Sequence, residues 1–336
     1  INLDNSASFV ASSAFYNNKT VQTVNLPYAT SVGNYAFYRC RSLTQVSLPV
    51  CKYIGMSVFY ECSSLSQVNL SMCEYISDRV FNDCSSLSQV NLPMCSYIGN
   101  GVFQLCSSLS QVSLPMCESV NTNAFDGCRH LTSIDLPMCS NIGQQTFNDC
   151  SSLSQVNLPI CEYIGSYAFR NCYSLSQISL PLCKSIYDYA FWFCSSFNII
   201  TIGYSSVCNL KNSNAFSKTQ ITSSTGSIYV PTSLVDAYKS APNWSYFSTQ
   251  IFPIIEPSLS FDSTTGLLSG NCSVLISSVE INSFLSDNNI DRASITQISL
   301  PYLTYFAGFE TFAGCSNLIS VSLPVCDDIG AQTFES

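Results

Sequence analysis

A 22-residue repeat runs through most of the sequence, and it limits the chain to folds built from stacked, similar units. A phenylalanine column keeps this period from Phe15 to Phe191, and an aliphatic column keeps it from Ile54 to Ile186. A leucine column, followed by proline in all units but one, has the same spacing at Leu26, Leu48, Leu70, Leu92, Leu114, Leu136, Leu158 and Leu180. A fixed period of this length is typical of solenoids and related arrays.

One unit, residues 43–64, predicts a strand followed by a return segment. Apolar and polar residues alternate over Thr44–Leu48, which indicates a strand with one face inward, and Pro49 ends it because proline supplies no ladder donor. The second half has apolar residues at roughly helical spacing, so we expect a short helical turn or irregular coil at Ile54, Val58, Phe59 and Cys62. Such a unit cannot bury its apolar face alone, so we expect stacked copies with parallel strands about 4.8 Å apart.

The unit resembles a known repeat family. Leu43-x-x-Val46-x-Leu48-x-x-Cys51 is similar to the strand signature of leucine-rich repeats, with Cys at the Asn/Cys position. The second half, which runs from Ile54 to Leu65 as I-G-x-x-V-F-x-x-C-x-S-L, resembles the BspA-like subclass, and the match covers residues 9–202 and 295–334. The resemblance implies an α/β fold: a right-handed solenoid with a parallel β-sheet on its concave face and short helical or irregular convex segments. It also implies a secreted or cell-surface adhesion protein, from a gut anaerobic bacterium.

Changes in the period divide the chain into four parts. We predict a repeat array over residues 1–202, a degenerate last coil and cap over 203–256, an irregular segment over 257–294, and a second short repeat stretch over 295–336. In the second stretch Leu300, Phe312 and Leu323 restart the pattern. The chain begins without Met and within the repeat pattern, so we expect a piece of something longer.

Several elements are expected in the cap. Ser227–Val230 is the expected last strand, and Ser233–Ala241 is an expected short helix, with Ser233 and Asp236 at capping-box spacing. A terminal coil must cover its open core. We expect that cover from Trp244, Tyr246, Phe247 and Phe252. Asp262–Gly266 has the composition of a turn.

The chain contains 19 cysteines, and from Cys40 to Cys194 they recur every 11 residues. This spacing predicts two ladders of stacked thiols. In-register neighbours would lie about 4.8 Å apart, beyond the usual Cβ separation of about 3.8 Å in a disulfide. No close pair of zinc ligands occurs. The pattern favours buried free thiols that pack as small apolar groups, with disulfides as the alternative, and predicts no metal site.

The composition argues against several function classes. The net charge is −9, and the twelve basic residues form no cluster, so a nucleic-acid partner is not expected. No apolar run is long enough to span a membrane. The single histidine, His130, excludes a two-histidine metal site, and no phosphate loop, nucleophile motif or dinucleotide fingerprint occurs. We therefore predict neither catalysis nor a cofactor.

The outward strand positions form the candidate binding surface. In nearly every unit these positions hold uncharged side chains that can form hydrogen bonds. The candidate residues are Gln45, Ser47, Gln67, Asn69, Gln89, Asn91, Gln111, Ser113, Gln155, Asn157, Gln177 and Ser179. One interpretation is a surface that binds a host or bacterial surface protein or glycan, in an extracellular or cell-surface location. The other is a structural spacer or surface-layer repeat in which amide and hydroxyl ladders only stabilise the sheet. A tyrosine column at Tyr53, Tyr75, Tyr97 and Tyr163 either lines a rim of this surface or packs over the turn.

Overall fold

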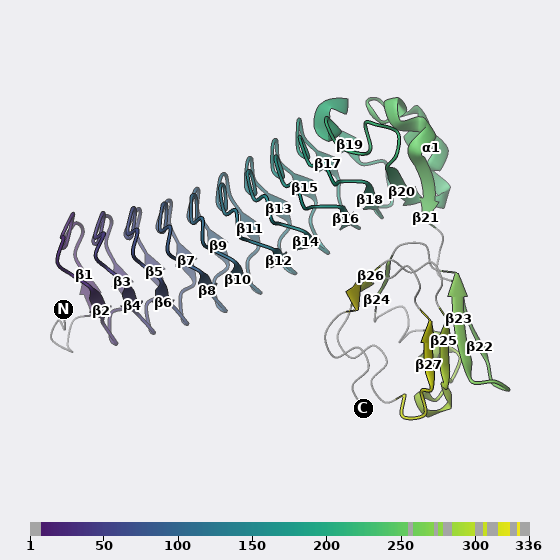
Figure 1. The fold of residues 1–336 in the computed structure, drawn as a ribbon, viewed down its shortest axis with the longest axis horizontal. Helices are drawn as coiled ribbons and strands as arrows, with labels where there is room; N and C mark the ends of the chain where they lie inside the picture. Colours follow the sequence, from purple (N-terminus) through teal and green to yellow (C-terminus); the bar gives the residue numbers. More distant parts are fainter. Residues whose placement is uncertain are drawn as a thin grey trace. The chain divides into compact units, whose positions relative to one another are not determined.

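A computed structural model describes residues 8–254, 258–271, 275–277, 284–299, 305–307, 315–322 and 328–329. The chain separates into two compact units, Ile1–Phe252 and Pro253–Ser336. The first unit contains the long repeat array, whose rungs stand in a row in Figure 1. The parallel-strand solenoid predicted from the 22-residue period is confirmed.

The predicted strand of each unit is present, and these strands form one side of the array. They are β2 (Thr23–Asn25), β4 (Gln45–Ser47), β6 (Gln67–Asn69), β8 (Gln89–Asn91), β10 (Gln111–Ser113), β12 (Ser133–Asp135), β14 (Gln155–Asn157), β16 (Gln177–Leu180) and β18 (Ile199–Ile202). Residues 22 apart pair in parallel register, for example Gln45 with Gln67. The middle residue points inward, as Val46 does at 1% exposure, because successive side chains of a strand alternate between its two faces.

A second ladder of two-residue strands runs through the return segments, and the sequence analysis did not predict it. Its strands are β1 (Phe9–Val10), β3 (Ser31–Val32), β5 (Tyr53–Ile54), β7 (Tyr75–Ile76), β9 (Tyr97–Ile98), β11 (Ser119–Val120), β13 (Asn141–Ile142), β15 (Tyr163–Ile164), β17 (Ser185–Ile186) and β19 (Asn209–Leu210). They form one continuous ten-stranded parallel sheet. The inward aliphatic residue of each pair, such as Ile54, is the aliphatic column seen in the sequence.

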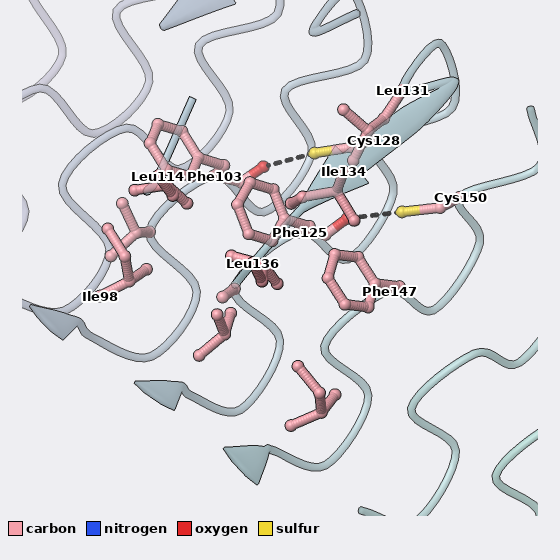
Figure 2. Close-up of a cluster of buried hydrophobic side chains, with 14 of the residues drawn as sticks. Ile98, Phe103, Leu114, Phe125, Cys128, Leu131, Ile134, Leu136, Phe147 and Cys150 are labelled. Atoms are coloured by element: carbon pink, nitrogen blue, oxygen red, sulfur yellow. Dashed lines mark hydrogen bonds between the residues drawn. The ribbon is translucent and has the colours of Figure 1, made fainter. Parts of the chain in front are cut away.

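The phenylalanine column is the centre of the core. Phe125 lies between Phe103 and Phe147, with ring centroids 5.2 and 5.4 Å apart and rings within 17° of parallel. Figure 2 shows these rings piled one above another, with leucine and isoleucine side chains beside them. All three rings are fully buried. The rings of successive rungs therefore provide the apolar contacts that no single rung could supply.

Each return segment makes its turn with two residues in the left-handed region, and nearly all of them carry a side chain. Leu105 has φ 61°, and the equivalent residues one rung away are Asp83 at 57° and Gly127 at 77°. A left-handed backbone costs an L-residue about 1–2 kcal/mol. The repeat offsets this cost through rung-to-rung hydrogen bonds, such as the one from Leu105 N to Asp126 O at 2.7 Å. The sequence gives little sign of these turns, because glycine is rare in them.

Replacing Leu105 with glycine is therefore expected to stabilise the array by about 0.5–1 kcal/mol, since relief of the left-handed strain exceeds the added chain entropy. Leu105 is 49% exposed, so little packing is lost. Urea unfolding checks the prediction. Leu105→Ala removes the same side chain but keeps Cβ, and it should show no gain. A glycine variant no more stable than the alanine variant would contradict the argument.

A cap covers the last rung of the array. It follows η1 (Ser213–Phe216) and contains β20 (Ser227–Pro231), η2 (Thr232–Leu234), α1 (Val235–Ser240), η3 (Trp244–Gln250) and β21 (Ile251–Ile254). The predicted last strand is confirmed as β20, which pairs in parallel with β18. The predicted capping box is wrong: the residue that caps α1 is Leu234, and it makes no side-chain cap bond. Here the chain enters α1 directly from the 3-10 turn η2, so no open helix end is left for Ser233 to cap.

Only half of the expected apolar cover is buried. Trp244 is 1% and Phe247 5% exposed, and both contact Phe216, the last ring of the column. Tyr246 is 75% and Phe252 42% exposed, so the expectation for these two is wrong. Tyr246 follows the exposed Ser245, between the buried Trp244 and Phe247 of η3, and a 3-10 turn directs only some of its residues to one side.

The second unit repeats the parallel ladder in short form. β22 (Ser258–Asp262) pairs antiparallel with β23 (Leu267–Asn271), and β25 (Gln297–Ser299) and β27 (Ser320–Ser322) add in parallel. A three-stranded ladder contains β24 (Leu275–Ser277), β26 (Tyr305–Ala307) and β28 (Asp328–Ile329), and η4 (Arg292–Ser294) precedes β25. The predicted turn is confirmed, because the Asp262 carboxylate accepts the backbone N–H of Thr264 at 2.9 Å. Leu300, Phe312 and Leu323 lie outside the described residues.

Candidate functional site

The outward residues of β4 to β16 form a continuous surface, which we call the polar strand face. Besides Ser133 and the acidic Asp135 of β12, it contains the twelve candidate residues of the sequence analysis, and the structure brings all twelve onto one side of the array. Nine are exposed, and Ser47, Gln177 and Ser179 are half-buried. None of the twelve carries a charge.

The hydroxyl column beside this face is used inside the protein. The Thr44 hydroxyl donates to the carbonyl of Gln22 at 3.0 Å, and the Ser66 hydroxyl donates to the carbonyl of Thr44 at 3.3 Å. The hydroxyls of Ser110 and Ser154 make the same bond at 3.2 Å. These side chains hold one rung to the next, as the structural interpretation of the polar columns predicts.

The glutamine column behaves differently. Within the described residues, no hydrogen bond reaches the side-chain amide of Gln45, Gln67, Gln89 or Gln111, and all four residues are exposed. Elsewhere on the face Asn157 donates to the Asp135 carboxylate at 2.8 Å, so its amide is partly used. Each glutamine amide offers two donors and an acceptor to a partner. The structural interpretation therefore accounts for the hydroxyl column and not for these four glutamines.

The polar strand face is not one continuous sheet. Its ladder is interrupted between β6 and β8, between β10 and β12, and between β14 and β16, although these strands stay adjacent. The middle residues next to these breaks, Val68, Val112 and Val156, are only partly buried. The first break lies under an open depression of about 560 Å³ over β6, β8 and β10. Its lining combines the amides of Gln67, Gln89 and Gln111 with half-exposed valine.

The tyrosine column belongs to the second sheet and packs on itself. Tyr53 stacks on Tyr75 with centroids 5.3 Å apart, and Tyr75 stacks on Tyr97 at 4.6 Å. Burial raises the pKa of Tyr75. Tyr163 has Asn141 and Ser185 as its neighbours in the ladder and stands apart from this stack. Because the ring faces contact one another, the column presents ring edges to solvent, which favours the packing interpretation.

An exposed apolar column was missed by the sequence analysis. The second residue after the leucine column is apolar in eight successive rungs. At seven of these positions it is 39–60% exposed, namely at Tyr28, Val50, Met72, Met94, Met116, Met138 and Leu182. The repeated Leu-Pro-Met-Cys sequence is the signal that could have identified it. A contiguous apolar stripe on a surface is more informative than single exposed residues.

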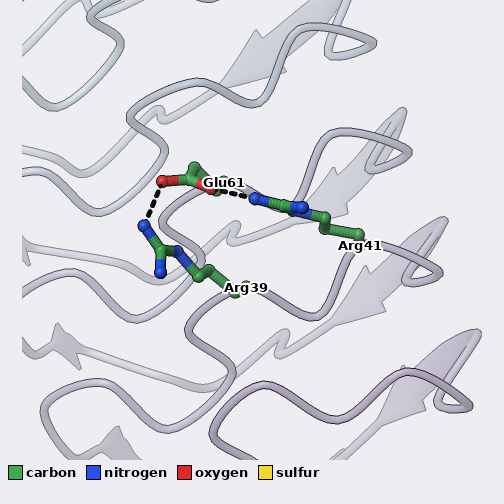
Figure 3. Close-up of polar contacts among 3 residues, drawn as sticks. All are labelled: Arg39, Arg41 and Glu61. Atoms are coloured by element: carbon green, nitrogen blue, oxygen red, sulfur yellow. Dashed lines mark hydrogen bonds and ion pairs between the residues drawn. The ribbon is translucent and has the colours of Figure 1, made fainter.

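In the main charged cluster of the array, two arginines share one glutamate (Figure 3). Arg39 donates to the Glu61 carboxylate at 2.9 Å, and Arg41 contacts the other oxygen of the same group. The hydrogen bond from Arg39 holds the pKa of Glu61 below its ordinary value, against the opposing effect of burial. The cluster ties two rungs together, and its charges already have partners.

The described residues contain no group of three or more His, Cys, Asp or Glu side chains arranged to hold a metal ion. His130 is exposed, and its Nδ1 atom lies 2.5 Å from the carbonyl oxygen of Ser107. Its side chain therefore contacts the backbone of the preceding rung. Helices in the part of the chain that the structure describes are all too short or too polar to cross a membrane.

Comparison with solved structures finds leucine-rich repeat proteins of bacteria. A leucine-rich repeat protein from Bacteroides ovatus is 21% identical and covers 92% of this chain and 83% of its own, with a TM-score of 0.47. The T. pallidum leucine rich repeat protein is 31% identical over 50% of this chain and 82% of its own, with a TM-score of 0.45. A leucine rich cell surface protein from Faecalibacterium prausnitzii is 21% identical over 72% of this chain and 86% of its own, with a TM-score of 0.32. No curated protein matches the sequence.

The family model for the BspA type leucine rich repeat region matches in six copies, over residues 1–110, 118–241 and 260–336. Together these ranges include nearly the whole chain. They contain all the strands of the polar strand face except Gln111–Ser113. The chain belongs to the BspA-type leucine-rich repeat family.

Proposed function

We propose that the protein is a non-enzymatic binding module, secreted or displayed on the cell surface, that recognises a protein or glycan through the polar strand face. The observation that carries this proposal is the row of exposed glutamine amides, at Gln45, Gln67, Gln89 and Gln111, that have no hydrogen-bond partner within the described residues. The related F. prausnitzii protein is described as a cell surface protein, which supports the location.

The chemistry of the face favours an uncharged, extended partner. The amides can both donate and accept, so they suit sugar hydroxyls or a polypeptide backbone. The depression over β6, β8 and β10 adds half-exposed Val68 and Val112, which can contact an apolar ring face or side chain. The rungs repeat the same groups, and repeated weak contacts along one partner add to a strong total.

A structural spacer remains the second candidate, and one observation favours it. The hydroxyl column donates to backbone carbonyls of the preceding rung and has no proton left to donate to a ligand. A spacer would use the whole strand face in this way. The unpartnered glutamines distinguish the two proposals, because a spacer does not need them.

Replacing Gln67, Gln89 and Gln111 together by glutamate should weaken partner binding at least tenfold, a loss of about 1.4 kcal/mol, because three carboxylates remove donors and add mutual repulsion. A glycan array and a panel of immobilised extracellular-matrix proteins supply the partner, and titration of the best hit measures the dissociation constant.

The control adds the same charge to three neighbouring rungs elsewhere, as Thr122→Asp, Gln144→Glu and Ser166→Asp. This turn column already contains Asp78 and Asp188, so it tolerates carboxylates. Unchanged affinity in the glutamine variant would reject the polar strand face as the binding site. A chain that binds no probe and only associates with itself would favour the spacer.

A further inference from the structure

Two buried thiols meet at the end of the repeat array. The Sγ atoms of Cys183 and Cys208 are 3.8 Å apart, and both residues are fully buried. Cys183 precedes β17, and Cys208 precedes β19, so the pair joins the last regular rung to the first rung beyond the insertion. The two residues are 25 positions apart, where the regular repeat would separate them by 22.

The thiols of the array are generally directed at backbone oxygen, and Cys183 also lies 3.6 Å from the carbonyl oxygen of Ser185. In one cysteine column Sγ donates to a phenylalanine carbonyl 25 residues earlier, as from Cys128 to Phe103 at 3.1 Å (Figure 2). In the other column Sγ donates to the carbonyl two residues ahead, as from Cys95 to Tyr97 at 3.2 Å. Cys183 and Cys208 differ from this pattern, because their sulfur atoms lie 3.8 Å from each other.

A shift in register explains the difference. Ser185 pairs with Asn209, so Cys208 corresponds to Lys184 and is one position out of the cysteine column. In-register cysteines on neighbouring strands stay about 4.8 Å apart, too far for the Cβ separation of a disulfide. The displaced Cys208 escapes this restriction. Its backbone is held in place by the cap, since its N–H donates to the Tyr238 hydroxyl at 2.9 Å and its carbonyl accepts from Trp244 Nε1 at 2.6 Å.

We propose that Cys183 and Cys208 are a disulfide-forming pair that covalently fastens the rung of β19, to which the cap is hydrogen-bonded, to the preceding rung. Closing the bond requires the sulfur atoms to approach from 3.8 Å to about 2.05 Å, a movement within the reach of side-chain rotation and a small backbone shift. We expect the cysteines that keep the 22-residue register to stay reduced, because their Cβ atoms are about 4.8 Å apart and their thiols donate to backbone carbonyls.

The reaction is thiol–disulfide exchange with a small-molecule disulfide as the oxidant. The thiolate of one cysteine attacks the oxidant and releases one thiolate, which gives a mixed disulfide with the protein. The second cysteine then attacks the protein sulfur of that mixed disulfide, so that the S–S bond forms and a second small thiolate leaves. The oxidant gains two electrons, and its two thiolates take up the two protons. The exchange takes place before the cap closes, because both sulfurs are buried afterwards.

Peptide mapping after refolding tests the proposal. The unfolded chain is refolded in a mixture of oxidised and reduced glutathione, alkylated, and digested with trypsin without reduction. Cleavage after Arg170, Lys184 and Lys211 separates the two cysteines onto residues 171–184 and 185–211. We expect these two peptides to be joined in most molecules, and fragmentation to place the bond between Cys183 and Cys208.

The same two peptides contain Cys172 and Cys194, which provide matched controls. Cys183→Ser and Cys208→Ser should each abolish the link, whereas Cys172→Ser and Cys194→Ser should leave it in place. The linked protein should also melt at a higher temperature than its reduced form, and this difference should vanish in Cys208→Ser. If Cys183 and Cys208 are both alkylated after refolding, or if the link persists in Cys183→Ser, the proposal is wrong. If a serine variant does not refold, the tryptic digest of the unsubstituted protein is sufficient to test the proposal.

Discussion

Raising the pH from about 8 to about 10 is expected to unfold the repeat array, because the unfolded chain releases thiol protons that the folded chain retains. Burial raises the pKa of Cys40, Cys51 and Cys95 to about 11. Burial also raises the pKa of the more deeply enclosed thiols, such as Cys106 and Cys150. An unfolded cysteine titrates near 8.5.

The sign follows from which state binds more protons. Above pH of about 8.5 the unfolded chain has fewer bound protons than the folded chain, so the free energy of unfolding falls as the pH rises. Each buried thiol contributes at most about 1.4 kcal/mol per pH unit, and even ten such thiols give a loss on the order of 10 kcal/mol per unit. This is comparable to the whole stability of a typical domain. Below about pH 8 these thiols are protonated in both states and the effect disappears.

Urea unfolding at a series of pH values between 7 and 9.5 measures this slope. A variant with Cys106→Ser and Cys128→Ser keeps two donors for the phenylalanine carbonyls that these thiols contact, but it lacks two titrating groups. Its slope should be smaller by about 2.7 kcal/mol per pH unit where the unfolded thiols are ionised. A stability that stays constant up to pH 9.5 would show that the buried thiols do not titrate as this structure requires.

The second large effect is expected from the core. Replacing Phe125 with alanine should lower the free energy of unfolding by about 3–5 kcal/mol, because it removes a fully buried ring and leaves a cavity between two others. The ring contacts Phe103 on one side and Phe147 on the other (Figure 2). Backbone hydrogen bonds on both sides of the gap, from Phe103 N to Ala124 O and from Phe125 N to Thr146 O, prevent the rungs from collapsing into it.

Phe15→Ala is the matched control, because Phe15 stacks on a single ring, that of Phe37, and is only partly buried. It should cost less than half as much. Chemical denaturation followed by circular dichroism compares the two variants. Equal losses at the two positions would contradict the view that the column is stabilised by contacts from both neighbouring rungs.

The sequence alone determined the rung and its inward face. The 22-residue period, the alternation around Val46 and the phenylalanine column are local patterns, and each specifies which side chains must be buried by neighbours. The same alternation placed Gln67, Gln89 and Gln111 outward on one strand face, as the structure has them. The Ser227–Val230 strand and the Asp262–Gly266 turn were also readable, because each depends on residues close together in the chain.

Other features were decided by tertiary structure, because they depend on distances between rungs. Whether a polar side chain finds a partner depends on the neighbouring backbone, so only the structure separated the bonded Ser66 hydroxyl from the unpartnered Gln67 amide. The breaks beside Val68 and Val112 and the second sheet likewise arise from how successive rungs stack. The left-handed Leu105 is held by hydrogen bonds from the next rung, against its own propensity. In the sequence, Cys208 does not keep the 11-residue spacing of the other cysteines. Its proximity to Cys183 follows from the pairing of β19 with β17, which only the structure shows.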